Sequence, residues 1–291
     1  MRLRTTFALA AWLALWAAML AAQSAPLAMP GSVTAGSAFS ISTSGSGQAV
    51  FYLVGPEQAL RRDLQLGDTI SIAAGELHNA GHYTALLVGP SSAQAADFDV
   101  TAAPEPATLS FLAKPSRLPV NLPDGISGVV YVFDAFGNLI LDPKQISFDL
   151  SEAGGATQTQ SVSTRNGVAW LKLHSAPKAG AAQFEAHIAK LSAKRIVQQV
   201  SGDPCNLRMS ARKSNGQIEL ETQPLLDCSG NAVPDGTIVT FKESFNGTET
   251  TVDVPIKRGV ARTTVPDYRN GVISVATGVV MGNEIRLGGG L

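Results

Sequence analysis

The 291-residue sequence has few of the residue types that carry chemistry. It contains four histidines and two cysteines, and only 15% of its residues are charged, with a formal net charge of −1. This composition argues against a nucleic-acid-binding role, because a phosphate backbone requires a concentrated basic face. Aromatic residues make up 6% of the chain. We therefore expect cores built from Val, Ile, Leu and Ala, with few platforms on which a ligand could stack.

The N-terminus has the pattern of a secretory signal. Arg2 and Arg4 precede an uncharged apolar run over residues 7–22, and Ala22-Gln23-Ser24 provides small residues for cleavage. The apolar run is shorter than the roughly 20 residues that cross a bilayer. We predict a signal peptide over residues 1–24, no membrane span in the mature chain, and export to the periplasm, the extracellular medium or the cell surface.

Both cysteines, Cys205 and Cys228, lie in the last third of the chain. In an exported protein such a pair is more often a structural disulfide than two free thiols. A catalytic thiol or a metal site is disfavoured, because no histidine occurs in that part of the sequence. We expect no metal and no cofactor.

A five-residue motif occurs twice and reveals the organisation of the chain. Asp134-Ala-Phe-Gly-Asn138 recurs 93 residues later as Asp227-Cys-Ser-Gly-Asn231. The aspartate can accept backbone N–H bonds, and Gly137 and Gly230 tolerate positive φ, so both segments are predicted to be tight turns. A repeat of this length is one compact domain. Four further pairs keep nearly the same spacing: Ile146 with Val239, Phe148 with Phe241, Gly167 with Gly259, and Gly180 with Gly271.

Short runs of alternating polarity, separated by turn residues, indicate an all-β protein. Only residues 58–66 have a helical pattern. Proline-bearing linkers at 101–106 and 201–204 favour separate domains over one large β-barrel or β-helix. The prediction is three tandem immunoglobulin-like antiparallel β-sandwich domains. We name them the first module (27–102), the middle module (107–200) and the third module (204–291).

The middle and third modules resemble the bacterial immunoglobulin-like domains of the intimin and invasin type, over residues 107–291. The first module fits only the broader immunoglobulin-like class. Such domains serve as spacers, tethers or binding surfaces, so the resemblance implies a fold and leaves the activity open. The residues that carry it are Asp134, Gly137, Asn138, Ile146, Phe148, Gly167, Ala169, Ala179 and Gly180, followed by Asp227, Gly230, Asn231, Pro234, Val239, Phe241, Gly259, Ala261 and Gly271.

Three local patterns could indicate chemistry. His78 and His82 have the spacing of two zinc ligands on a helix, but the residues between them favour a turn. Asp134 and Asp227 could bind calcium between modules, although closing their own turns explains them more simply. Two Ser-x-x-Lys matches, at 175–178 and 210–213, lie in turn and strand sequence instead of on a helix. We therefore predict no catalytic residue and no enzymatic activity.

The sequence thus predicts an exported, non-enzymatic array that acts in cell-envelope adhesion, in binding, or as a spacer. Its partner would be a protein or glycan at the envelope. Trp170 is the predicted contact residue, because alternation puts it on an outward face. Two alternatives remain open: a periplasmic assembly factor that offers a sheet edge like a chaperone, and a carbohydrate-binding accessory protein.

Overall fold

A computed structural model describes residues 27–90, 92–152 and 155–288 of the chain. The predicted signal peptide lies outside the described residues. All regular structure in the described ranges is β-strand, with no helix. Accordingly, those ranges include no helix with the length and apolar character needed to span a membrane. The chain is an all-β array of three tandem immunoglobulin-like sandwiches, as predicted.

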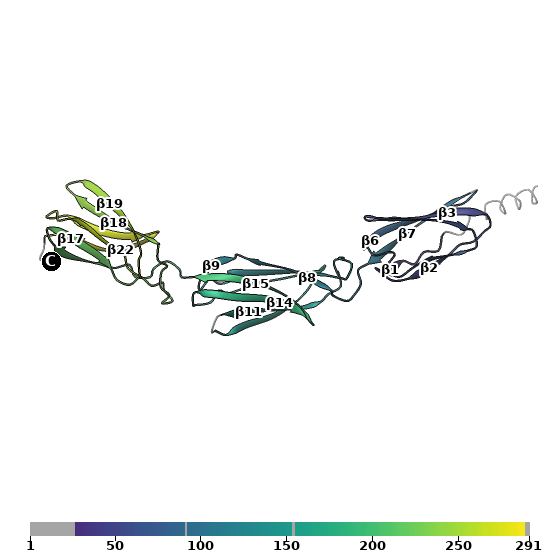
Figure 1. Cartoon of the computed structure of the whole chain (residues 1–291), viewed down its shortest axis with the longest axis horizontal. Coiled ribbons are helices and arrows are strands. Elements are labelled where there is room, and N and C mark those ends of the chain that lie inside the picture. Colours follow the sequence, from purple (N-terminus) through teal and green to yellow (C-terminus); the bar gives the residue numbers. More distant parts are fainter. Residues whose placement is uncertain (1–26, 91, 153–154, 289–291) are drawn as a thin grey trace, which may run out of the picture. The chain divides into compact units, whose positions relative to one another are not determined.

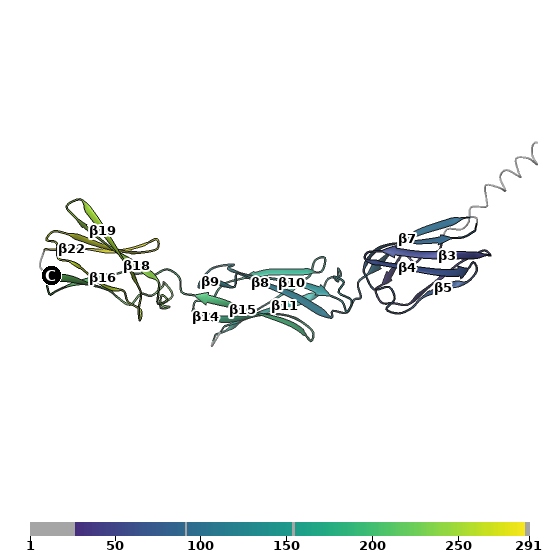
Figure 2. The ribbon, with the colours of Figure 1, turned by 45° about the horizontal axis from the view of Figure 1, so that its top comes forward.

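The first module is a sandwich of a five-stranded and a two-stranded sheet. The larger sheet has the order β1-β7-β6-β3-β4, and β2 pairs with β5 in the smaller one. Figure 1 shows β6 and β7 in the layer opposite β2, and Figure 2 shows β3 and β4 side by side. The strands are β1 (Ser32–Thr34), β2 (Phe39–Ser42), β3 (Gln48–Gly55), β4 (Gln58–Gln65), β5 (Thr69–Ile72), β6 (Gly81–Val88) and β7 (Ala93–Thr101).

The helical pattern over residues 58–66 is wrong as a guide to structure, since this segment is strand β4. It pairs antiparallel with β3 along its whole length. Its residues alternate between exposed positions and partly buried positions such as Leu60 and Leu64, which pack against the core of the first module. Pairing with an apolar neighbour strand and burial of these leucines override the local helical preference.

The middle module combines a three-stranded sheet, β13-β10-β8, with a five-stranded sheet, β12-β11-β14-β15-β9. Three buried rings form the centre of its core. Phe111 lies 5.0 Å from Phe184 and 6.1 Å from Phe148, measured between ring centroids. The strands are β8 (Thr108–Lys114), β9 (Arg117–Pro119), β10 (Ile126–Phe133), β11 (Gln145–Glu152), β12 (Thr157–Ser163), β13 (Val168–Leu173), β14 (Gly180–Ile188) and β15 (Leu191–Val200).

The third module repeats this plan with sheets β16-β17-β20 and β19-β18-β21-β22. The buried positions follow the sequence repeat, because Val239 and Phe241 of β18 are as fully buried as Ile146 and Phe148 of β11. The strands are β16 (Met209–Ser214), β17 (Gln217–Thr222), β18 (Ile238–Phe245), β19 (Thr248–Pro255), β20 (Arg262–Pro266), β21 (Val272–Thr277) and β22 (Val280–Arg286).

By density of contacts the chain divides into two compact units. One comprises the described residues up to Thr108 together with Val132–Asp142, and the other comprises Leu109–Tyr131 and the residues from Pro143 onward. The segment 132–142, which contains the first copy of the repeated turn, therefore belongs with the first module. The hydrogen bonds of that turn explain this assignment. The three domain boundaries proposed from the sequence stay predictions.

Candidate functional site

The first copy of the repeated turn is organised around the carboxylate of Asp134, which is only 1% exposed. One oxygen, Oδ1, accepts hydrogen bonds from the backbone amides of Phe136 (2.9 Å) and Asn138 (2.8 Å). The other, Oδ2, accepts from the Asn138 side chain (2.9 Å) and from the backbone amide of Ala103 (2.8 Å). Gly137 has a φ of 84°, as the turn requires. Asp134 therefore closes its own turn and also holds the segment that follows β7.

The side chain of Asn138 continues the same network toward the loop before β6. Its Nδ2 donates to the carbonyl of His78 (2.7 Å), and its Oδ1 accepts from the amide of Ala80 (2.8 Å). An asparagine side chain offers a donor and an acceptor on one plane, so a single residue can bond both groups of a backbone segment. These bonds attach the turn after β10 to the first module within the first compact unit.

The second copy of the turn makes the same set of bonds within the second unit. Asp227 is 5% exposed. Its Oδ1 accepts from the amides of Ser229 (2.8 Å) and Asn231 (2.9 Å), and its Oδ2 accepts from the amide of Gly202 (3.0 Å). Gly230 has a φ of 80°. The bond to Gly202 corresponds to the bond to Ala103, at a spacing of 99 residues.

Asn231 likewise attaches its turn to the middle module. Its Nδ2 donates to the carbonyl of Pro177 (2.8 Å), and its Oδ1 accepts from the amide of Ala179 (2.9 Å). Asn121 Nδ2 adds a bond to Ser229 Oγ. The turn that was predicted to close on itself is thus also a joint to the preceding sandwich. Sequence reasoning missed this role, although the Ala-Gly pair at 80–81 recurs at 179–180, the same 99-residue spacing.

Both buried aspartates are held in the ionised form. Burial raises the pKa of the Asp134 carboxyl, but the bonds from the Asn138 side chain and from the amides of Ala103, Asn138 and Phe136 outweigh it, so the net pKa is lowered. The pKa of Asp227 is lowered for the same reason, with burial opposed by bonds from Asn231, Gly202 and Ser229. Charge-assisted bonds of this kind are about twice as strong as neutral ones.

A disulfide lies at the second turn. Cys228, inside the motif, is bonded to Cys205, and the two Cα atoms are 4.8 Å apart. The amide of Cys205 also donates to the carbonyl of Leu226 (3.0 Å). The disulfide thus ties the start of the third module to its turn. The middle module has Ala135 in the position of Cys228, so its turn relies on hydrogen bonds alone.

Trp170 lies on the outward face of β13, at an edge of the three-stranded sheet of the middle module. Its side chain is 64% exposed, and it stands opposite Val129 of β10. The equivalent position of the third module carries Arg262, which donates to Glu221 (2.7 Å). The outward orientation is the one that alternation gave. The role of Trp170 in binding stays a proposal.

The two histidines with zinc-like spacing face different surroundings. The ring of His78 stacks on Phe136, with ring centroids 6.0 Å apart. His82 is on β6, where its Nδ1 lies 3.0 Å from Asp99 Oδ1 and its Nε2 lies 3.9 Å from Asp97. The hydrogen bond with Asp99 raises the pKa of His82. The described ranges bring together no group of three or more His, Cys, Asp and Glu side chains that could hold a metal ion.

The serines of the two Ser-x-x-Lys matches make structural hydrogen bonds. Ser175 Oγ is buried, donates to the carbonyl of Pro119 (2.9 Å) and accepts from the amide of Leu122 (2.8 Å). Ser210 Oγ donates to the carbonyl of Glu221 on the neighbouring strand (3.3 Å). A nucleophilic serine needs a general base within hydrogen-bond reach. The bonds made here hold loops and strands together instead.

No protein-family model matches the chain, and no curated protein is similar to it in sequence. Among solved structures, InvD of Yersinia pseudotuberculosis is 14% identical, covers 90% of this chain and 96% of its own length, and superposes with a TM-score of 0.50. The fold is that of a bacterial immunoglobulin-like array. The sequence resemblance is therefore confirmed at the level of the fold.

Two further structures are similar at lower TM-scores. Invasin, described as a bacterial integrin-binding protein, is 11% identical over 86% of this array, with a TM-score of 0.48. The array spans 56% of the invasin chain. The FN1–FN3 domains of chicken CNTN1 are 10% identical and cover 90% of the array and 99% of their own chain, with a TM-score of 0.35.

Proposed function

We propose that this chain is an exported, non-enzymatic array of immunoglobulin-like modules that acts in cell-envelope adhesion, in binding, or as a spacer. The observation that carries the proposal is the repeated buried turn. Asn231 bonds the third module to a loop of the middle one and Asp227 bonds the linker at Gly202. Asn138 and Asp134 make the corresponding bonds in the first unit. Modules that are joined by hydrogen bonds from a turn to the preceding sandwich are suited to a protein that exposes its sheet faces and loops to a binding partner.

The structural hydrogen bonds made by the polar side chains considered above, within the described regions, support a role other than catalysis. The carboxylates of Asp134 and Asp227 accept hydrogen bonds from backbone amides. The serines of the Ser-x-x-Lys matches donate hydrogen bonds to backbone carbonyls of neighbouring segments. Catalytic sites require a nucleophile or a general acid and base converging on one cleft. The proposed activity is therefore binding through exposed faces of the sandwiches.

The partner we propose is a protein or glycan at the envelope, contacted by Trp170. A large aromatic side chain on an outward sheet face, exposed to 64%, can pack on an apolar protein surface or on a sugar ring. Arg262 occupies the equivalent position in the third module, so it provides a matched control for any change made at Trp170.

The binding test compares purified wild-type protein with Trp170→Ala and Arg262→Ala. Retention on intact bacterial cells and on a panel of immobilised polysaccharides would be measured. We expect Trp170→Ala to reduce retention at least tenfold and Arg262→Ala to leave it unchanged. Retention on polysaccharide alone would favour the carbohydrate-binding alternative. Equal retention of all three proteins would refute the role of Trp170.

Export is tested separately. The chain, expressed with its own leader in a bacterial host, should be found outside the cytoplasm with Cys205 and Cys228 oxidised, as read by mass spectrometry after thiol alkylation. Recovery of the full-length chain from the cytoplasm with both thiols free would contradict the proposed location.

A further inference from the structure

The outward face of the large sheet of the first module carries a group of apolar residues at positions that normally meet water, beside polar residues such as Thr84 and Asp97. On β3 the outward residues are Val50, Tyr52 and Val54, and on β6 they include Leu86 and Val88. Val54 is 54% exposed and Val88 38% exposed. The adjoining strands extend the face with Ala59 on β4 and with Ala93 and Ala95 on β7. We call these eight residues the β3–β6 face.

The inward positions of β3 are apolar as well, since Phe51 and Leu53 are fully buried in the core of the first module. The strand is therefore apolar on both sides, which is typical of strands that are covered on both faces. An exposed sheet usually alternates apolar and polar residues instead. The outward residues of β3 thus indicate that a second surface covers this face.

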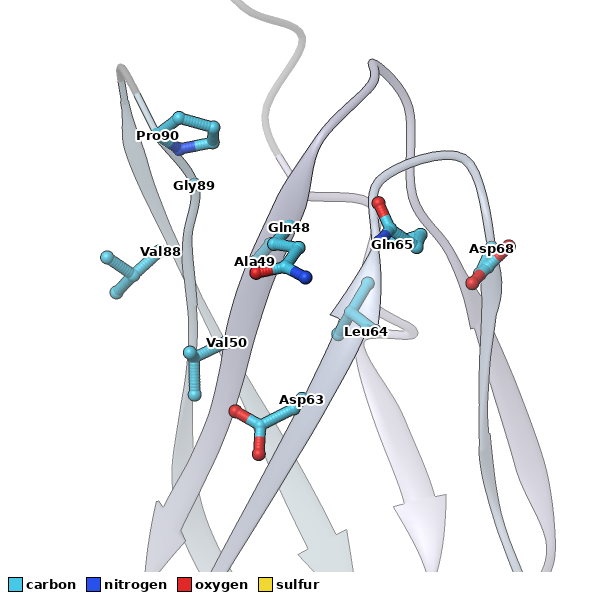
Figure 3. Close-up of a pocket in the computed structure, with 10 residues that line it drawn as sticks. All are labelled: Gln48, Ala49, Val50, Asp63, Leu64, Gln65, Asp68, Val88, Gly89 and Pro90. Atoms are coloured by element: carbon cyan, nitrogen blue, oxygen red, sulfur yellow. The ribbon is translucent and has the colours of Figure 1, made fainter.

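Figure 3 shows one end of the face, where an open hollow of about 570 Å³ is lined by Val50, Val88, Asp63, Gln48 and Gln65, among others. Strands lie about 4.8 Å apart and outward residues follow one another every ~6.8 Å along a strand, so the eight residues of the face cover roughly 260 Å². The largest apolar patch on a typical monomer is about 300–600 Å² and is often functional, and this face approaches that range.

The strand register makes this face complementary to itself. Consider a two-fold axis that lies between two copies of the sheet, runs parallel to the strands, and passes over the line between β3 and β6. It would place β3 of one copy over β6 of the other, and β4 over β7. The register then sets Val50 opposite Val88 and Tyr52 opposite Leu86 of the second copy, which gives an apolar centre. Two sheets packed face to face lie about 10 Å apart.

The outer strands fit the same arrangement. Position by position, the register opposes Asp63 to Ala93, Arg61 to Ala95, and Ala59 to Asp97. Each of these three charged side chains thus meets an alanine of the other copy. Arg61, which pairs with Asp63 of its own chain (2.7 Å), also comes one outward position from Asp97 of the second copy, so opposite charges of the two copies are brought close twice. The net charge is −1 for the full sequence and, without Arg2 and Arg4 of the predicted leader, −1 − 2 = −3, which adds little long-range repulsion.

We propose that the β3–β6 face binds a second copy of this chain in a two-fold symmetric dimer. The interface is small, and interfaces of less than about 1,200 Å² in total are transient. We therefore expect a dissociation constant in the micromolar range. This inference is independent of the proposed function, since it concerns the first module alone and involves neither Trp170 nor the turns.

The test is the mean mass of the purified protein by sedimentation equilibrium across the micromolar range. Wild type should rise from monomer to dimer with concentration. Leu86→Arg, at the centre of the face, should weaken association at least tenfold. Met281→Arg is the matched control, because Met281 is an apolar residue of the third module with 70% exposure. It should behave like wild type.

Exchanging the charges of Arg61 and Asp97 gives a second test. Recovery of association in the double variant could not be explained by a folding defect. Arg61→Glu alone should weaken association, and the combination of Arg61→Glu with Asp97→Arg should recover most of it, since both members of the pair are exchanged in each copy. The proposal is overturned if wild type stays monomeric throughout. It is also overturned if Leu86→Arg associates like wild type, or if the exchanged pair is weaker than the single change.

Discussion

The buried carboxylate of Asp227 gives the sharpest prediction about stability. Asp227→Asn preserves the shape of the side chain and the oxygen that faces Ser229 and Asn231, but it replaces the second oxygen with an NH2 group. That group would then face the amide of Gly202 (3.0 Å from Oδ2) and the Nδ2 of Asn231 (3.0 Å). Two hydrogen bonds that a charged oxygen accepts are thereby replaced by two contacts between N–H donors.

The size of the effect follows from those two bonds. A hydrogen bond to a charged group contributes about 1.5–3 kcal/mol, and such contributions are not fully additive. Asn231 keeps its bond to Pro177, so part of the network survives. We therefore expect Asp227→Asn to lower the free energy of unfolding of the third module by roughly 2–4 kcal/mol.

The assay is urea unfolding followed by the methyl resonances of Ile218 and Ile273, which are fully buried in the third module. The matched control is Asp235→Asn. Asp235 also accepts two backbone amides, from Arg258 (2.8 Å) and Gly259 (3.1 Å), but it does so at the surface, so its loss should be clearly smaller. Equal losses for the two variants, or no loss for Asp227→Asn, would refute the reasoning.

Three further predictions concern the third module and the pH dependence of stability. Replacing Cys205 and Cys228 by serine removes a cross-link over a loop of 23 residues and should cost about 3 kcal/mol, measured by calorimetry with the reduced wild type for comparison. The lowered pKa values of Asp134 and Asp227 stabilise the folded state above their unfolded pKa near 3.9. The unfolding free energy should fall as pH drops below about 4, and less so in Asp227→Asn. Burial raises the pKa of Glu243, and its Oε1 has no hydrogen-bond partner among the described residues. Its ionisation therefore opposes folding at neutral pH, and Glu243→Gln should raise the melting temperature at pH 7 but not near pH 4.

Local patterns in the sequence predicted the all-β class and the two motif turns. Alternation gave the outward position of Trp170, which is 64% exposed. The two motif glycines have positive φ, as their turns required. The pair of cysteines, together with the predicted export, predicted the disulfide between Cys205 and Cys228. Each of these follows from residues close together in sequence or from a pair of rare residues.

The parts that could not be predicted depend on distant contacts. Asn138 bonds residues 58 and 60 positions earlier, and nothing near it in sequence marks those partners. Residues 58–66 form a strand because β3 lies beside them. The apolar outward face of β3 could not be recognised either, because a continuous run such as residues 49–54 does not say which of its faces meets water.

Hydrogen exchange at four backbone amides tests most directly whether the repeated turns anchor on the preceding sandwiches. These amides are in loops outside the strands, and each donates to a side chain of the motif: Ala80, Ala103, Ala179 and Gly202. We predict that all four exchange at least a hundredfold more slowly than an unprotected amide, and that Ala179 loses its protection in Asn231→Ala. Exchange at the unprotected rate, while the strand amides stay protected, would contradict the account.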